Sequence, residues 1–337
     1  MIFSKKRDLL IGLFLSIGAL YYTFKDVSFL KLKDALSTIH YIYIVFALLL
    51  ITLSFIIRAI RWSYLIRAIK EVNISNLFSP LMIGFMGNML PARAGELIRA
   101  YLLGKRENIK FSASFATIFI ERLFDMILIL LMLGGVLLFG SDNLANLSVE
   151  NRRLIMKFGW LSVGLCFLII LFSYLILYYN PQLMRFIRLL IKPLSEGIRF
   201  KIIRFIDSFT EGLKILKDLK GLIIVLILSI GMWIVITISY YPLYLAMDLS
   251  HLPLISLITL VVIICIFIAL LPTPGFIGPY HAACVVGLHN IYNVSEPIAA
   301  GFGIISWFVQ MGTVIILGLF FIFKDNITIK EIQGGID

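Results

Sequence analysis

Apolar residues along this chain gather in long runs that polar segments separate. A bilayer core needs about 20 apolar residues for one helical crossing, and six of the runs approach or exceed that length. They cover residues 9–24, 41–57, 115–140, 158–179, 222–247 and 298–323. This pattern predicts an all-α polytopic membrane protein with six full spans.

Two further apolar stretches, 77–103 and 254–292, are each broken near the middle by proline and glycine. An unpaired backbone polar group in lipid costs several kcal/mol, so broken helix persists only where protein or water surrounds it. We therefore predict two re-entrant hairpins, which in transporters form a binding site at the bilayer midplane. An alternative layout makes 254–271 a full span and 279–292 a separate one. The breaking residues are Pro91, Gly95, Pro272, Pro274, Gly275, Gly278 and Pro279.

Both halves of the chain then follow one plan, which is span, span, broken hairpin, span. The first hairpin is entered from inside and the second from outside, so the plan is an inverted repeat. The expected domain is a single unit over 1–330, with repeat one at 1–140, a joining loop at 141–157 and repeat two at 158–325. Direct similarity between the halves is faint, so this prediction rests on topology.

Lysine and arginine residues predict the orientation, because inner loops carry an excess of both. The inner segments of this layout hold 23 basic residues and the outer loops hold 6, while Arg122 remains inside a span. We expect a multi-pass protein of the cell (inner) membrane with both termini cytoplasmic. The inner segments are 1–8, 58–76, 91–110, 180–221 and 324–337.

The composition agrees with a membrane protein. Hydrophobic residues make up 61% of the 337 residues and charged residues 15%, against about 25% charged in a typical soluble domain. The net charge of +11 is explained by attraction to the anionic inner leaflet, so no nucleic-acid partner is expected. Because the three cysteines lie in apolar segments without a CxxC spacing, we expect no disulfide framework and no zinc site. We also expect no other metal and no cofactor.

The long basic inner loop at 180–221 contains a helical pattern of apolar residues with basic residues between them. The pattern predicts an amphipathic helix lying in the inner interface. A structural elbow that joins the two halves is the favoured interpretation over a regulatory or partner-binding role. The apolar residues are Ile198, Ile202, Phe205, Phe209, Leu213 and Leu216.

Three charged residues, Glu121, Arg122 and Asp125, occur within one predicted span. Charged residues at this depth face the bundle interior or water. Glu121 and Asp125 share one helix face, and Arg122 is three residues from Asp125, so an internal ion pair is sterically available. The trio is either a structural clamp to the first hairpin or part of the substrate site, and the two roles are compatible.

Each hairpin offers a helix start that favours anions. In the first, we expect a helix from near Pro91 that carries Arg93, Glu96 and Arg99. The positive end of that helix and the forked donors of Arg93 would bind a phosphate or carboxylate. In the second, Pro279 plays the starting role and His281 lies on the first turn, as a ligand or as a satisfied interior histidine.

Three segments together resemble the flippase-like transmembrane domain of lysylphosphatidylglycerol synthases. They are NMLPARAGELIRAYLLG at 88–104, ERLFD at 121–125 and LPTPGFIGPYHAA at 271–283. Two features depart from the family pattern: His281 and Phe276 replace an acidic residue and a glycine, and the last span lacks its usual arginine. The resemblance carries a site over to Asn88, Pro91, Arg93, Gly95, Glu96, Arg99, Glu121, Arg122, Asp125, Pro274, Gly275 and Gly278.

The resemblance implies a stand-alone domain that moves an aminoacylated or otherwise modified phospholipid between leaflets. We expect a flippase or scramblase whose partner is an anionic or aminoacylated phospholipid; a homo-oligomer is left open. Glu96, Glu121, Asp125 and His281 would balance charge or carry a proton. The family's soluble aminoacyl-transferring domain is not expected here, so synthase activity is not carried over. The alternatives are a membrane-embedded transferase with Glu121 or Asp125 as base, and a scaffold for a separate synthase.

Overall fold

The computed structural model describes residues 16–21, 29–37, 39–89, 94–139, 195–271 and 273–328, with scattered positions at 14, 23 and 25 and between 150 and 192. Regular structure in these ranges is helical throughout. At least half of each of the predicted spans 9–24 and 158–179, and of the loop 141–157, lies outside the described residues. Pro91, Arg93 and Pro272 also lie outside them.

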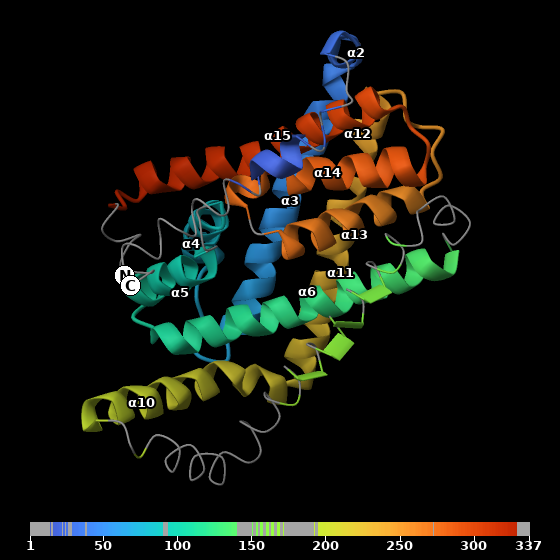
Figure 1. Ribbon diagram of the computed structural model, residues 1–337. Helices are drawn as coiled ribbons and strands as arrows, with labels where there is room; N and C mark the ends of the chain where they lie inside the picture. Colours follow the sequence, from blue (N-terminus) through green and yellow to red (C-terminus); the bar gives the residue numbers. More distant parts are fainter. Residues whose placement is uncertain are drawn as a thin grey trace.

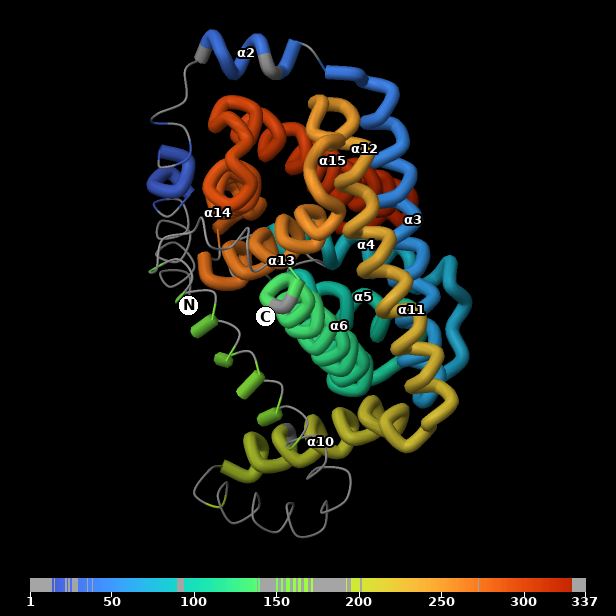
Figure 2. The backbone as a smooth tube through the Cα atoms, turned by 90° about the vertical axis from the view of Figure 1, so that its right-hand side faces the viewer, coloured from blue at the N-terminus to red at the C-terminus, as the bar shows by residue number. Residues whose placement is uncertain are grey.

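Four helices correspond to predicted spans: α3 (Tyr41–Ile66), α6 (Phe111–Phe139), α11 (Leu219–Ile238) and α15 (Glu296–Lys324). Among the described residues, Tyr41–Ile66, Leu219–Ala246 and Glu296–Lys324 are long and apolar enough to cross a membrane. The last residues of the second segment form the short helix α12 (Tyr241–Ala246). α3 and α11 pack side by side, and α6, α13 (Ile255–Leu270) and α15 lie across them (Figures 1 and 2). α2 (Phe29–Ser37) packs against α15.

α3 is longer than the predicted span at 41–57, which corrects the assignment of 58–76 to an inner loop. The helix continues to Ile66 because Ala59, Trp62 and Leu65 extend its fully buried face. Arg58 and Arg61 are therefore buried inside the protein, so Arg122 is not the sole arginine within a long apolar helix. Together with buried Arg99, they leave 20 inner basic residues against 6 outer ones, and the orientation stays a prediction.

The first broken stretch forms two packed helices, α4 (Ile74–Gly87) and α5 (Gly95–Glu107). α5 begins at Gly95 rather than near Pro91, which corrects the predicted helix start. The reason is contact with α4, since a Cβ at Gly95 would collide with the Gly84 carbonyl oxygen and the Asn88 side chain. Asn88 Oδ1 accepts a hydrogen bond from the Gly95 N–H at 3.0 Å and so caps the new helix.

The second broken stretch runs from α13 through a short 3₁₀ turn (Pro274–Phe276) into α14 (Pro279–Val285) and a π-helical turn (Val286–Ile291). Pro279 is the first residue of α14, as predicted. Gly275 and Gly278 have φ angles of +61° and +96°. These left-handed conformations favour glycine and interrupt the helix at the predicted place.

The two breaks contact each other, because the Gly275 N–H donates a hydrogen bond to the Met89 carbonyl oxygen at 2.9 Å. Each unit also packs along α6. α5 contacts its first half, where Arg99 meets Glu121, and α13 contacts its second half, where Leu133 packs against Val262. The units therefore approach each other from opposite ends of α6 (Figure 1).

The amphipathic segment of the long inner loop forms α10 (Glu196–Leu213). Its buried residues Phe209 and Leu213 face the start of α6, and Gly212 lies against the Ala113 carbonyl oxygen. These contacts fit the structural elbow, with α10 crossing beneath α6 in Figure 2. A position in the membrane interface stays a prediction.

Candidate functional site

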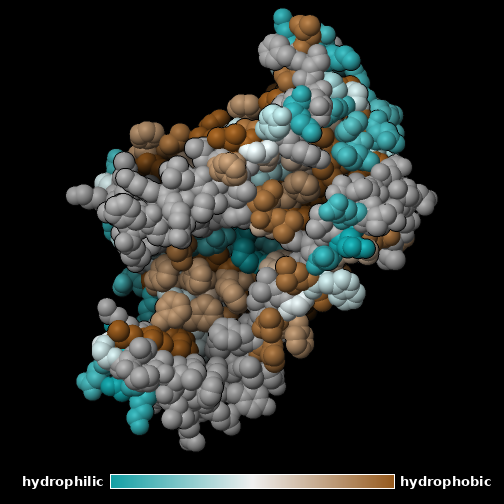
Figure 3. Space-filling view, viewed as in Figure 1, coloured by the Kyte–Doolittle hydropathy of each residue, from teal (hydrophilic) through white to brown (hydrophobic). Residues whose placement is uncertain are grey.

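A cavity of about 310 Å³ lies where the two broken units meet. α3, α6, α11, α13 and α15 contribute to its wall, and both breaks reach it through Asn88 and Phe276. In the space-filling view, hydrophilic atoms lie in a recess at the middle of the molecule's face, between hydrophobic surfaces (Figure 3). The polar residues that line the cavity are Ser54, Arg58, Asn88, Glu96, Arg122, Tyr240, Tyr280 and Gln310.

A fully buried ion-pair cluster supports one side of the cavity. Arg61 lies 2.7 Å from Asp125 and 3.2 Å from Glu121, and its Nη1 also donates to Ser229 at 3.0 Å. Arg99 binds both oxygens of Glu121, at 3.0 and 2.9 Å, and its guanidinium lies 3.7 Å above the Trp62 ring. These contacts tie α3, α5, α6 and α11 together, as expected of the structural clamp proposed for the charged trio.

Arg122 connects this cluster to the cavity. Its Nη2 lies 2.6 Å from Glu121 and 3.4 Å from Asp125, so the predicted ion pair with Asp125 is confirmed. The side chain is 35% exposed and lines the cavity, unlike the fully enclosed Arg61. Arg122 is therefore both a member of the clamp and a cation that a ligand in the cavity can reach.

Arg58 is the residue that the sequence analysis missed. It is 9% exposed and lines the cavity, and its nearest carboxylate, Asp125, is 3.9 Å away. Its Nε and Nη1 atoms are buried without a hydrogen-bond partner, while its guanidinium lies 4.9 Å from the Phe85 ring centroid. A buried donor without an acceptor costs about 1–3 kcal/mol. The arrangement therefore favours a ligand that brings an acceptor.

Among the residues that the structure describes, the charges around the cavity do not balance. Four arginines (Arg58, Arg61, Arg99 and Arg122) face three carboxylates, from Glu121, Asp125 and the cavity-lining Glu96. One positive charge is left over in surroundings where an uncompensated charge is costly. A ligand with one negative charge would neutralise it.

The other predicted site residues have separate positions. Asn88 and Glu96 line the cavity, whereas Arg99, Glu121 and Asp125 lie behind its wall. Gly275 and Gly278 shape the second break through their backbone. His281 lies on the first turn of α14, as predicted, with its ring 6.1 Å from that of Trp307, but its neighbour Tyr280 is the residue that lines the cavity.

Hydroxyl and amide groups also line the cavity, and they were not predicted from the sequence. The Tyr240 and Tyr280 hydroxyls lie 3.1 Å apart, and Gln310 Nε2 donates to Ser239 Oγ at 3.2 Å. Tyr240 is 4% exposed and lies in the interior of the protein. These groups can donate hydrogen bonds without adding charge.

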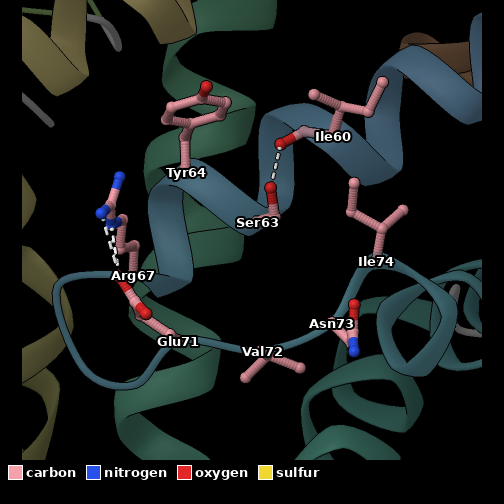
Figure 4. A pocket seen from close by; sticks show the side chains of 8 residues that line it. All are labelled: Ile60, Ser63, Tyr64, Arg67, Glu71, Val72, Asn73 and Ile74. Atoms are coloured by element: carbon pink, nitrogen blue, oxygen red, sulfur yellow. Dashed lines mark hydrogen bonds and ion pairs between the residues drawn. The ribbon is translucent and has the colours of Figure 1, made fainter.

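A separate cavity of about 540 Å³ lies at the end of α3 and in the turn to α4 (Figure 4). Its charged residues, Arg67 and Glu71, pair with each other at 2.9 Å, and their side chains are 64% and 77% exposed. These groups are already hydrated and paired, so the arrangement offers a ligand less than the central cavity does.

Comparison with known proteins is consistent with the sequence resemblance. The family model of the lysylphosphatidylglycerol synthase transmembrane region matches residues 9–318. A UPF0104 membrane protein of Methanocaldococcus jannaschii is 30% identical over 169 residues, which are 49% of this chain and 63% of that relative. Another from the same organism is 25% identical over 279 residues, which are 77% of each chain.

A shorter match, 33% identical over 93 residues, links the chain to a Haloferax volcanii protein named Glycosyltransferase AglD. It covers 27% of this chain and 15% of that protein. No solved structure matches. The family match extends over most of the chain, so the protein belongs to the lysylphosphatidylglycerol synthase transmembrane family and is a multi-pass integral membrane protein.

Proposed function

We propose that this member of the family moves a phospholipid with an anionic head group between the two leaflets of the cell membrane. The observation that carries the proposal is Arg58, a buried arginine with two unpaired nitrogen donors at a cavity whose described residues have one surplus positive charge. A phosphodiester supplies one negative charge and several acceptor oxygens. Arginine suits such a group because its planar fork of donors matches phosphate geometry.

The lengths of the broken helices support re-entrant insertion. α4, α5 and α13 contain 14, 13 and 16 residues. At 1.5 Å per residue they extend about 20–24 Å, which is less than the roughly 30 Å of a bilayer core. We propose that each broken unit enters and leaves on one side and that the two tips meet around the cavity. A head group could then reach the cavity from either leaflet.

Each charged residue has a proposed role. Arg58 and Arg122 bind the phosphate. Glu96 offsets one of the positive charges at the cavity, and its carboxylate accepts a hydrogen bond from the ammonium group of an aminoacylated lipid. Glu121 and Asp125 are each within salt-bridge distance of three arginines. We therefore assign them to holding those arginines rather than to carrying protons.

A membrane-embedded transferase is the alternative, and the short match to a protein named as a glycosyltransferase is the observation in its favour. A general base must come within hydrogen-bond reach of the proton that it removes. The cavity lining contains neither Glu121 nor Asp125. Among the described residues, Glu96 is the carboxylate in that lining. We favour transport, in which Glu96 balances charge and no base is needed.

Purified protein in liposomes tests the proposal with a fluorescent phosphatidylglycerol and a reductant that quenches only the outer leaflet. We expect the wild-type protein to carry labelled lipid from the inner to the outer leaflet, where the reductant quenches it. Arg58→Met should slow this translocation at least tenfold. Arg67→Met is the control, since Arg67 is an exposed arginine at the end of the same helix. Wild-type translocation by folded Arg58→Met would remove the proposed site. A new lipid species in extracts, without translocation, would identify the transferase.

A further inference from the structure

A second hollow, of about 600 Å³, opens between α6, α11 and α13. Its wall is apolar apart from the Thr237 hydroxyl and the Trp233 indole N–H. Four of its residues are strongly exposed: Leu131, Phe139, Ile234 and Leu254 are 65%, 82%, 52% and 70% accessible. In a membrane protein such a surface faces lipid chains. We call this hollow the lateral groove.

The lateral groove and the central cavity share one residue, Trp233 of α11. Trp233 is 8% exposed, and its indole N–H points at Asp125 Oδ1 at 3.3 Å. Neighbouring residues divide between the two spaces: Ile236 lines the cavity and Thr237 the groove. On α13, Val261 lines the cavity and Ile258 the groove. The two hollows are therefore adjacent and Trp233 separates them.

We propose that the lateral groove binds one acyl chain of the lipid whose head group occupies the central cavity, and that Trp233 is the partition between chain and head group. This inference rests on the proposed function. The occupant is an acyl chain because a phospholipid has a charged head group joined to apolar chains. The charged cavity fits the head group, and the adjacent apolar, lipid-exposed groove fits a chain. The arginines neutralise the phosphate, and the groove keeps the chain out of the polar cavity.

Affinity in this arrangement comes from the head group. Lipid chains are as apolar as the side chains of the groove, so moving a chain from bilayer to groove has no hydrophobic driving force. The groove instead determines where the chain lies while the head group is bound. An indole suits the partition, because its N–H contacts the charged cluster and its apolar faces contact the chain. Occupancy of the groove should therefore depend on Arg58.

Photo-crosslinking in nanodiscs tests this dependence, with a phosphatidylglycerol that carries a diazirine on one acyl chain. Bulk lipid labels every exposed surface, so the readout is the change in labelling between wild type and Arg58→Met. We expect labelling of groove residues such as Leu131 and Ile234 to be at least threefold lower in the variant than in the wild type. Label on Phe308 of α15, which is 62% exposed and outside the groove, should not change.

A matched pair of substitutions on α11 tests the same inference through transport. Ile234→Trp fills the groove, while Ile227→Trp places the same ring on a comparably exposed position (61%) outside it. We expect Ile234→Trp to slow translocation at least fivefold and Ile227→Trp to leave it unchanged. Binding of glycerol phosphate, which has no acyl chain, should be unaffected in both.

The results separate the two proposals. Groove labelling that is independent of Arg58, or equal translocation by the two tryptophan variants, would overturn the acyl-chain site. The head-group site would still stand if Arg58→Met lost translocation and glycerol phosphate binding. If Arg58→Met instead kept both, the proposed function would fail.

Discussion

Arg58 and Arg61 lie three residues apart on α3, and the same substitution at each should have different effects on the stability of the protein. Arg61 is 0% exposed and lies within ion-pair distance of Asp125 and Glu121, with a further hydrogen bond to Ser229. Arg58 has one distant carboxylate at 3.9 Å and two unpaired nitrogen atoms. We consider replacement of each by methionine, which keeps much of the apolar stem and removes the charge and the donors.

The magnitudes follow from the partners that are left behind. Removing one member of a buried ion pair costs about 3–5 kcal/mol, because the other charge stays buried. Asp125 and Glu121 would keep Arg122, and Glu121 would keep Arg99, so we expect Arg61→Met at the lower end, about 3 kcal/mol. Arg58→Met loses one weak contact and removes two unpaired donors that each cost about 1–3 kcal/mol. Its stability should stay within about 1 kcal/mol of wild type, or rise.

Reversible unfolding in detergent, followed by far-ultraviolet circular dichroism, measures both variants, with Arg67→Met as the exposed control. A gap of about 3 kcal/mol corresponds to more than a hundredfold difference in the unfolding equilibrium constant. Equal destabilisation by Arg58→Met and Arg61→Met would refute the reasoning. It would mean that Arg58 is held by the fold as firmly as Arg61 and is not reserved for a ligand.

Substitutions at three further positions test the backbone and the loop contacts. Gly95→Ala should destabilise by about 3 kcal/mol, the upper end for overpacking, because its Cβ meets backbone of α4; a wild-type unfolding midpoint would contradict the close approach. Phe276 has a φ of +58°, so Phe276→Gly should be about 1 kcal/mol more stable than Phe276→Ala, the reverse of the usual order in helices. Hydrogen bonds from Lys70 and Asn76 hold the pKa of Glu107 below its usual range. Wild type should therefore hold a stability advantage over Glu107→Gln above about pH 4.3 and lose it as the pH falls further, which unfolding curves between pH 3 and 6 would measure.

Both breaks could be predicted from the sequence because their cause is local. Proline removes a backbone donor and glycine permits left-handed backbone, so the positions around Gly275, Gly278 and Pro279 are visible in the residues themselves. The predicted start of α5 was wrong because its cause is not local. Proline at position 91 suggested a local start, but the start at Gly95 depends on contact with Gly84 and on the Asn88 side chain seven residues earlier.

The charged trio of α6 was found because each member interrupts an apolar run. Arg58 and Arg61 were assigned to a loop because they follow directly after the apolar run at 41–57. A drop in hydropathy at the end of such a run is typical of a membrane boundary. What keeps them buried is distant in sequence, since Arg61 pairs with Asp125 sixty-four residues away. A signal was nevertheless present, because Ala59, Trp62, Leu65 and Ile66 continue the apolar helical pattern beyond both arginines.

The clamp and the proposed site depend on each other through their charges. The two carboxylates of α6 allow three arginines, Arg58, Arg61 and Arg99, to be buried beside the half-buried Arg122, which none of the three could be alone. Since Arg61 and Arg99 occupy most of the acceptor oxygens, Arg58 is left with unpaired donors at the cavity. Adding one more carboxylate would satisfy Arg58 and remove the surplus charge. The proposed anion site therefore arises from a cluster whose described residues are one negative charge short, and the clamp that fixes α3, α5 and α6 also keeps this missing charge at the cavity wall.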